Sequence, residues 1–246
     1  MSDTVIRLED VHLSFPLVRY TAGGVKEAFL ALVKGRQRQQ SDKEFWALNG
    51  ITLSVEKRDV VGIVGKNGSG KSTMLRVISG IYSPDRGRCT VDGKVQFLDL
   101  GSGFRDELTG SENIRLAGAI LGLSPKQVGE HFDAIVDFAG IGDFIHQPLR
   151  TYSSGMRARL GFAVASVIEP DILLVDEVLA VGDADFKKKS MARMEEMVKN
   201  EGRTVVIVSH NMSELKRLCT RLILLEQGKV VADGGIDEVM ERYNKP

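Results

Sequence analysis

The sequence has little of what marks disulfide-rich, membrane-spanning or polyanion-binding proteins. Cysteine occurs only as Cys89 and Cys219, far apart and in neither a metal nor a redox spacing, so we expect ordinary thiols of a reducing compartment. No signal peptide opens the chain, and no apolar stretch approaches the roughly eighteen residues needed to span a bilayer. Lysine plus arginine and aspartate plus glutamate both number 33, which argues against a nucleic acid partner.

Length and hydrophobic patterning indicate a single α/β unit without internal repeats. At 246 residues the chain exceeds the usual domain size, but α/β folds of this length are commonly one domain with an inserted lobe. Residues 101–161 look helical, with start signals at Ser111 and Ser124-Pro125 and a break over Gly140 to Pro148. Apolar runs predict strands at Val5 to Phe15, Trp46 to Val55, Val60 to Val64, Thr90 to Leu100, Ile172 to Asp176, Thr204 to Val208 and around Leu222.

A phosphate-binding loop is predicted directly after the strand Val60 to Val64. The segment reads Gly65-Lys66-Asn67-Gly68-Ser69-Gly70-Lys71-Ser72-Thr73. Its glycines permit backbone conformations in which successive amides point at a triphosphate, and a helix is predicted over Ser72 to Ser79. At this spacing Lys71 neutralises the β and γ phosphates, and the Ser72 hydroxyl ligates Mg²⁺. The alternative is a glycine-rich turn between a strand and a helix.

Two acidic residues, Asp176 and Glu177, end the apolar run that begins at Ile172. Such a run suits a parallel strand that is buried on both faces, with its carboxylates at the edge of the sheet where ligands bind. Asp176 would hold the metal, and Glu177 could polarise a water aimed at the γ phosphate. The strand Thr204 to Val208 is followed by His210, which is either structural or bonded to the γ phosphate at the same edge.

Together with these motifs, the segment Tyr152-Ser153-Ser154-Gly155-Met156 resembles the signature of the ATP-binding cassette (ABC) ATPases, from Val5 to about Val231. The family's usual Leu-Ser-Gly-Gly-Gln is kept only at the serine and one glycine. A helix predicted over Arg157 to Ile168 would present free backbone N–H groups, a natural anion site. The alternative is a helix cap that binds no ligand.

The resemblance implies the P-loop ABC ATPase fold: a RecA-like mixed sheet with an antiparallel β subdomain and an inserted helical lobe. Within one domain, residues 1–246, the core would take residues 1–100 and 162–246, and the helical lobe residues 101–161. The resemblance also implies ATP and Mg²⁺ as ligands, with ATP bound between two copies. Ser153, Ser154 and Gly155 would then complete the nucleotide pocket of a second subunit.

Three further positions are carried over from the family. Phe15 falls where an aromatic residue stacks on adenine, although a strand phenylalanine is also ordinary core. Asp183 matches the loop aspartate that communicates between the two active sites. The glutamine expected near the end of the strand Lys94 to Leu100 is missing, because Gln96 comes too early. Asp99 holds the aligned place and is predicted to take the metal-side contact.

An insertion over residues 16–45 replaces the short hairpin that most family members have. Val25, Ala28, Phe29, Leu32 and Val33 fall at helical spacing on one face, and basic residues follow them. Either this amphipathic helix packs on its own domain, or it lies at an interface with its cations toward lipid phosphates or an anionic substrate.

This insertion and the sequences 98–113 and 175–183 resemble the exporters of O-antigen, capsule and teichoic acid. The resemblance implies an ATPase that binds an integral membrane permease at the cytoplasmic face of the plasma membrane and moves a lipid-linked glycan. An extra C-terminal glycan-binding domain is not expected, because the chain stops at Pro246. An ABC ATPase for another substrate and a soluble regulatory module are the alternatives. A coiled-coil chromosome ATPase needs a longer gap after Lys71, and a tandem ribosomal cassette needs a second P-loop.

Overall fold

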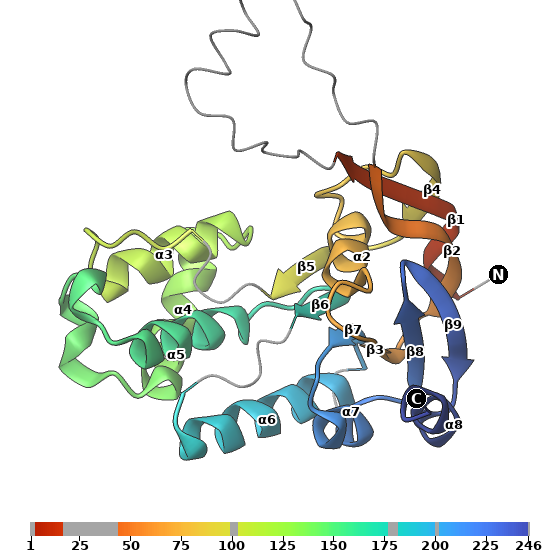
Figure 1. The fold of residues 1–246 in the computed structure, drawn as a ribbon. Helices are drawn as coiled ribbons and strands as arrows, with labels where there is room; N and C mark the ends of the chain where they lie inside the picture. Colours follow the sequence, from red (N-terminus) through yellow and green to blue (C-terminus); the bar gives the residue numbers. More distant parts are fainter. Residues whose placement is uncertain (1–2, 17–43, 99–102, 177–181, 200–201, 246) are drawn as a thin grey trace, which may run out of the picture.

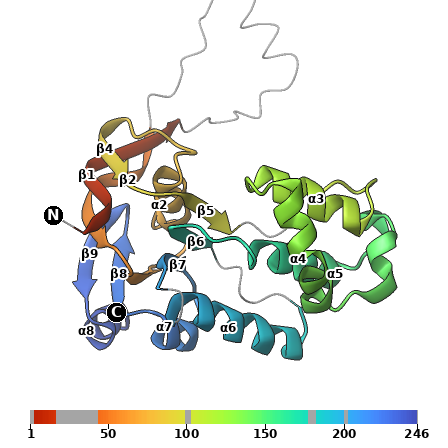
Figure 2. The same cartoon turned by 180° about the vertical axis from the view of Figure 1, so that it is seen from behind.

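The computed structural model of the chain describes residues 3–16, 44–98, 103–176, 182–199 and 202–245. These residues form a small antiparallel sheet, a larger mixed sheet and a group of helices that extends from one side of the larger sheet (Figure 1). The view from behind shows the same arrangement, with the helices α3, α4 and α5 far from the hairpin of β8 and β9 (Figure 2).

The small sheet joins three antiparallel strands in the order β2-β1-β4. They are β1 (Thr4–Pro16), β2 (Glu44–Glu56) and β4 (Arg86–Val91). β1 and β2 stay paired as far as Phe15 opposite Phe45 and Pro16 opposite Glu44. The predicted insertion therefore leaves and re-enters the fold at two neighbouring backbone positions. The apolar stripe predicted within it lies outside the described residues.

The larger sheet has the strand order β5-β6-β7-β3-β8-β9, and all its pairings are parallel except that of β8 with β9. Its strands are β3 (Val60–Val64), β5 (Val95–Leu98), β6 (Ile172–Asp176), β7 (Thr204–Val208), β8 (Arg221–Glu226) and β9 (Lys229–Gly234). Every residue of β3 and β7 is buried, as expected for strands with helices or a second sheet on both faces.

The predicted strand Thr90 to Leu100 is wrong in one respect. The chain turns after Val91, so that β4 belongs to the small sheet and β5 to the large one. Gly93 makes this turn with a φ of 121°, and a Cβ there would lie 2.9 Å from the Cβ of Asp171. The Asp171 carboxylate also accepts a 2.7 Å hydrogen bond from the backbone N–H of Lys94. The segment Asp92-Gly93-Lys94 thus turns between the two strands, and Asp171 packs against this turn.

Helices cover the large sheet and form the separate helical group. They are α2 (Lys71–Ile78), α3 (Gly110–Ile120), α4 (Pro125–Ala139), α5 (Ser154–Ala165), α6 (Ala184–Lys199), α7 (Met212–Leu218), α8 (Ile236–Tyr243) and the 3₁₀ helices η1 (Gly142–His146) and η2 (Leu149–Thr151). The start of α4 after Ser124 is confirmed, and Ser124 forms a capping box with Gln127. α3 instead starts after Thr109, two residues before the predicted Ser111, because Thr109 and Glu112 form the capping box there.

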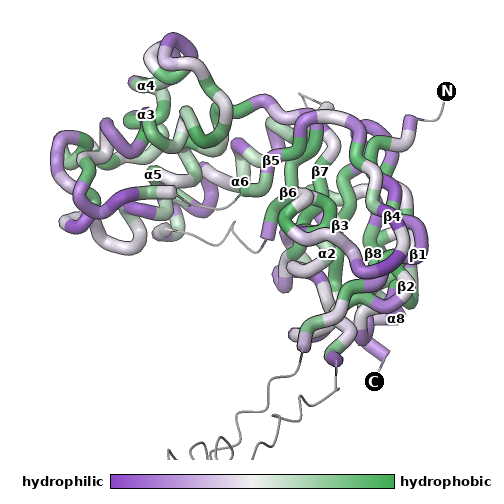
Figure 3. The backbone as a smooth tube through the Cα atoms, turned by 90° about the horizontal axis from the view of Figure 1, so that it is seen from above, coloured by the Kyte–Doolittle hydropathy of each residue, from purple (hydrophilic) through white to green (hydrophobic). Residues whose placement is uncertain are grey.

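Apolar side chains from alternate positions of the large sheet pack on its two faces. Val60 and Val64 of β3 belong to a cluster with α6, α7 and α8, whereas Val61 and Ile63 belong to one shared with the small sheet and α2. Figure 3 shows the hydrophobic stretches along β3, β6 and β7 between more polar connections. A third cluster, with Ile114 and Leu160 among its members, lies within the helical group. The large sheet thus lies between two well-packed apolar layers.

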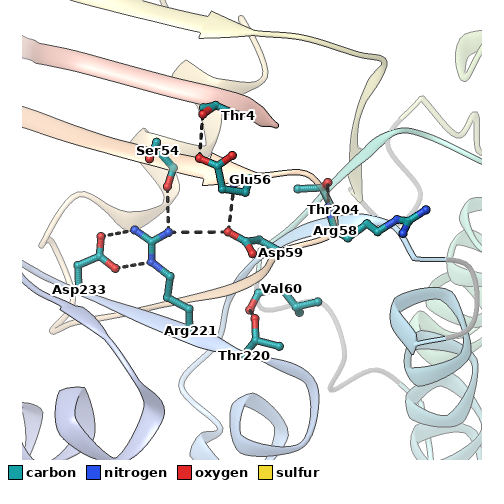
Figure 4. A network of polar contacts seen from close by, with 10 residues as sticks. All are labelled: Thr4, Ser54, Glu56, Arg58, Asp59, Val60, Thr204, Thr220, Arg221 and Asp233. Carbon is teal, nitrogen blue, oxygen red and sulfur yellow. Dashed lines mark hydrogen bonds and ion pairs between the residues drawn. The ribbon is translucent and has the colours of Figure 1, made fainter. Parts of the chain in front are cut away.

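Arg221 of β8 ties the large sheet to the small one (Figure 4). Its guanidinium makes a two-pronged contact with the Asp233 carboxylate of β9, and its Nη1 donates to the carbonyl oxygen of Ser54 on β2 at 3.0 Å. Asp59 lies 3.8 Å from the same Nη1 and accepts from the backbone N–H of Glu56. Planar two-pronged pairs of this kind fix direction as well as distance. The network therefore joins β2 of the small sheet to β8 of the large one.

Candidate nucleotide-binding site

The predicted phosphate loop lies where β3 turns into α2, so the predicted order of strand, loop and helix is confirmed. Gly70 caps α2 in the left-handed conformation, with a φ of 106°. Gly65 and Gly68 also have positive φ values, of 152° and 79°. No side chain in the described part of the chain caps the N-terminus of α2, and its first turn carries no acidic residue. The free N–H groups of this helix end suit an anion.

Close packing explains two of the three glycines. A Cβ at Gly65 would lie 2.2 Å from the carbonyl oxygen of Leu225, and a Cβ at Gly70 would lie 2.4 Å from that of Ala47. At Gly68, by contrast, no heavy atom of the described residues lies within 4 Å of the added Cβ. The loop is therefore packed against β8 and β2 on one side and open at Gly68.

Lys71 brings a positive charge into this loop. Its side chain is 6% exposed, and its Nζ donates to the carbonyl oxygens of Gly65 at 2.8 Å and Lys66 at 3.1 Å. Ser69 is 4% exposed, and its hydroxyl has no hydrogen-bond partner among the described residues. The buried Lys71 ammonium and a Ser69 hydroxyl that has no partner among the described residues both fit a polyanion with many acceptor oxygens. The half-buried Ser72 and Thr73 follow in the first turn of α2.

The carboxyl ends of four parallel strands meet beside this loop. The register places Ile63 of β3 opposite Val208 of β7, Val208 opposite Asp176 of β6, and Val175 opposite Leu98 of β5. The chain continues from these ends into the phosphate loop, His210 and the two predicted positions Glu177 and Asp99. Asp176 is half-buried at this edge and His210 is exposed. Glu177 and Asp99 lie outside the described residues.

The predicted signature residues form a second site at the start of α5. The helix begins at Ser154, three residues before the predicted Arg157, and ends at Ala165 rather than Ile168. Ser153 is its N-cap, because its hydroxyl accepts a 3.2 Å hydrogen bond from the N–H of Met156. Ser153, Ser154 and Gly155 line a cavity of about 550 Å³ together with Asp183. Two motifs carried over separately from the family thus share one cavity.

The remaining predicted positions have simpler surroundings. Phe15 is half-buried and meets Tyr82 edge-on, with ring centroids 5.7 Å apart. Gln96 points back to its own strand, where its side-chain N–H donates to the carbonyl oxygen of Phe97 at 2.9 Å. Phe15 therefore contacts the core. Its place at the end of β1 does not test the adenine contact, which stays a prediction.

Arg159 is a cavity residue that reasoning from the sequence missed. It lies one helical turn after Gly155, and its Nη1 is 3.3 Å from Oδ2 of Asp183. The Oδ1 of Asp183 accepts from the N–H of Phe186 at 2.9 Å, which is the main reason that the pKa of Asp183 is lowered. Spacing along the helix could have indicated Arg159, because residues four apart share a helix face.

A family model described as "ABC transporter" matches residues 48–180 of the chain. The chain belongs to the ABC transporter family. The O-antigen export system ATP-binding protein RfbB of Klebsiella pneumoniae is 39% identical over 250 residues, which cover 99% of this chain and 98% of that protein. The teichoic acids export ATP-binding protein TagH of Bacillus anthracis is 38% identical over 98% of this chain and 42% of its own length. The predicted family is thereby confirmed.

Solved structures confirm the predicted fold. A dimeric ATP-binding cassette in a post-hydrolysis state, bound to ADP and Pi, matches this ABC ATPase with a TM-score of 0.73 and 21% identity. The match covers 94% of this chain and 98% of that one. The mixed sheet, antiparallel subdomain and helices are thus the ABC cassette fold. None of the helices in the described part of the chain is long and apolar enough to cross a membrane.

Proposed function

We propose that this chain is the ATP-hydrolysing subunit of an exporter that moves a lipid-linked polysaccharide across the cytoplasmic membrane. The observation that carries the proposal is the 39% identity to an O-antigen export ATP-binding protein over almost the whole length of both chains. The similarity to a teichoic acids export ATP-binding protein points to the same substrate class. The glycan is an O-antigen, capsule or teichoic-acid type polymer.

In this proposal the phosphate loop binds ATP through Gly65 to Thr73. The buried ammonium of Lys71 exchanges its carbonyl partners for β and γ phosphate oxygens, because a charge-assisted bond to phosphate is the stronger one. Ser72 and Asp176 would hold Mg²⁺, and Asp99 would lie on the same side. Mg²⁺ commonly takes one or two protein oxygens besides phosphate oxygens, and it supplies charge neutralisation there.

Hydrolysis in this proposal needs a group that orients water toward the γ phosphate. Glu177 follows the metal-side Asp176 directly, so it is the proposed catalytic base. His210, at the end of the neighbouring β7, is proposed to bond the γ phosphate. Phe15 is proposed to stack on adenine from the end of β1.

A second copy of the chain is proposed to complete each ATP site. Lys66, Asn67, Gly68 and Ser69 of the phosphate loop line one cavity, and Ser153, Ser154, Gly155 and Asp183 line another. The two cavities share no residue in the described part of the chain. A head-to-tail dimer would bring the signature cavity of one copy to the phosphate loop of the other, where the free N–H groups of α5 reach the γ phosphate. The dimeric ATP-binding cassette bound to ADP and Pi supports this arrangement.

The proposed complex includes an integral membrane permease, and the chain would lie against it as a peripheral subunit on the cytoplasmic face. The insertion between Pro16 and Glu44 is proposed to contact lipid or the permease, since its basic end suits an anionic surface. Copurification with a membrane protein, followed by an export assay in cells, tests the transport part of the proposal. Glycan that still reaches the cell surface in a deletion strain would contradict it.

The ATPase part is tested with Glu177→Gln. We expect ATP binding to be kept and turnover to fall by roughly a hundredfold or more, because the water loses its base while the phosphate loop is intact. ATP with Mg²⁺ should then hold this variant as a dimer in sedimentation velocity. Near-normal hydrolysis would remove Glu177 from its role, and a monomer at saturating ATP would contradict the sandwich dimer.

A further inference from the structure

The signature cavity contains a charged pair whose role goes beyond the motifs. Arg159 and Gly155 lie one turn apart on α5, and Asp183 approaches from the start of α6. The Nη1 of Arg159 is 3.3 Å from Oδ2 of Asp183. The Arg159 side chain is 23% exposed, and its Nε is buried without a hydrogen-bond partner among the described residues. Asp183 therefore offsets a charge that is largely removed from water.

The carboxylate of Asp183 serves two helices at once. While Oδ2 faces Arg159 on α5, Oδ1 accepts from the N–H of Phe186, and the backbone carbonyl accepts from the N–H of Lys187. Asp183 is thus the cap of α6 as well as the partner of Arg159. The second turn of α5 and the first turn of α6 are thus held together by the Asp183 side chain at the wall of the cavity.

An aromatic contact, formed further along α5 than the cavity residues, links the same helices. Phe186 of α6 meets Phe162 of α5 edge-on, with ring centroids 6.0 Å apart. Phe138 of α4 stacks on Phe162 at 5.8 Å and meets Phe186 edge-on at 5.7 Å. Apolar packing therefore fixes the junction of the two helices at the level of Phe162. The polar contact between Arg159 and Asp183 holds the helices together nearer the N-terminus of α5, where its free N–H groups lie.

We propose that Arg159 is a positioning residue that holds Asp183 and the N-terminus of α5 in one arrangement, so that they meet the nucleotide and the second copy together. This inference rests on the proposed dimer function. Arg159 acts through Asp183 and does not touch the phosphates.

The test compares single and double variants in the Glu177→Gln background. Arg159→Met keeps the unbranched stem of the side chain and removes the guanidinium with its charge, and Asp183→Asn keeps the acceptor for the Phe186 N–H. We expect each to weaken the ATP-driven dimer by at least about fivefold, in the range of measured couplings between sites. The double variant should lose no more than either single one, because both remove the same contact.

Arg157→Met is the matched control. It removes the same charge two residues earlier on α5, but Arg157 faces Asp106 at 2.6 Å and the carbonyl oxygen of Leu149. We expect this control to dimerise like its parent. Arg159→Lys should recover most of the loss, because it restores the charge beside Asp183. Binding of a fluorescent ATP analogue to the monomer should be unchanged in every variant, because the phosphate loop is intact.

The outcomes separate this inference from the function on which it rests. If the parent dimerises and Arg159→Met dimerises equally well, or if the two single losses add in the double variant, the positioning role is wrong. A parent that stays monomeric contradicts the proposed dimer and this role with it. If Arg159→Lys fails to recover dimerisation, or if Arg157→Met is equally impaired, the effect is not specific to the contact with Asp183.

Discussion

Replacing Lys71 by Met should remove most of the ATP-dependent stabilisation while leaving the free protein nearly as stable. Lys71 is 6% exposed, and its ammonium donates to two carbonyl oxygens of its own loop. The substitution destabilises the protein by removing these hydrogen bonds and stabilises it by removing the cost of burying a charge. Because the two effects oppose each other, the melting temperature without ligand should change by no more than about 2–4 °C, or about 1 kcal/mol. A bond from Lys71 to phosphate is worth about 1.5–3 kcal/mol, so Kd should rise about 10- to 150-fold.

These values set the size of the thermal shift. A non-hydrolysable ATP analogue at about 100 times the Kd of the unmodified protein stabilises it by about 2.7 kcal/mol. For a domain of this size that corresponds to a shift of about 5–11 °C. If Kd rises about a hundredfold in Lys71→Met, the same ligand concentration gives about 0.4 kcal/mol, or about 1–2 °C.

The assay is differential scanning fluorimetry with Mg²⁺ and the analogue, and Lys126→Met is its control. Lys126 lies on α4, its side chain is 86% exposed, and among the described residues its one ion pair is a long 3.8 Å contact with Glu130. This control should keep the full ligand shift. A full shift in Lys71→Met would refute the phosphate contact. A drop of more than about 10 °C without ligand would show that Lys71 mainly stabilises the fold.

Other predictions follow from local packing. Gly65→Ala should destabilise the protein by about 1–3 kcal/mol and weaken ATP binding at least tenfold, because the added Cβ meets the Leu225 carbonyl oxygen. In the same denaturation series, Gly68→Ala should cost only about 1–2 kcal/mol, which is the cost of backbone strain. Arg221→Met should lower the free energy of unfolding by about 2–3 kcal/mol in urea titrations, since it leaves Asp233 and Ser54 without their donor. Burial raises the pKa of Cys219 to about 12, so this thiol should resist labelling at pH 8 until the protein unfolds, and its contribution to stability should be full below about pH 8.5 and decline as pH rises toward 12.

The sequence by itself determined the local elements of the site. Glycines at 65, 68 and 70 permit the positive φ values that the phosphate loop adopts, and Val60 to Val64 contains enough apolar residues for a fully buried strand. These features depend on each residue's own backbone and hydropathy, which can be read without knowing the rest of the fold. The same holds for the capping box at Ser124, since both partners lie within four residues.

Only the tertiary structure decided the contacts between distant segments. The turn between β4 and β5 is packed against Asp171, and the close packing at Gly65 is against Leu225, about 160 residues away. The contact of Arg159 with Asp183 likewise requires α5 and α6 to lie side by side. The physical reason is that such contacts follow from strand order and helix packing, and one segment's sequence carries no information about which distant backbone will lie against it.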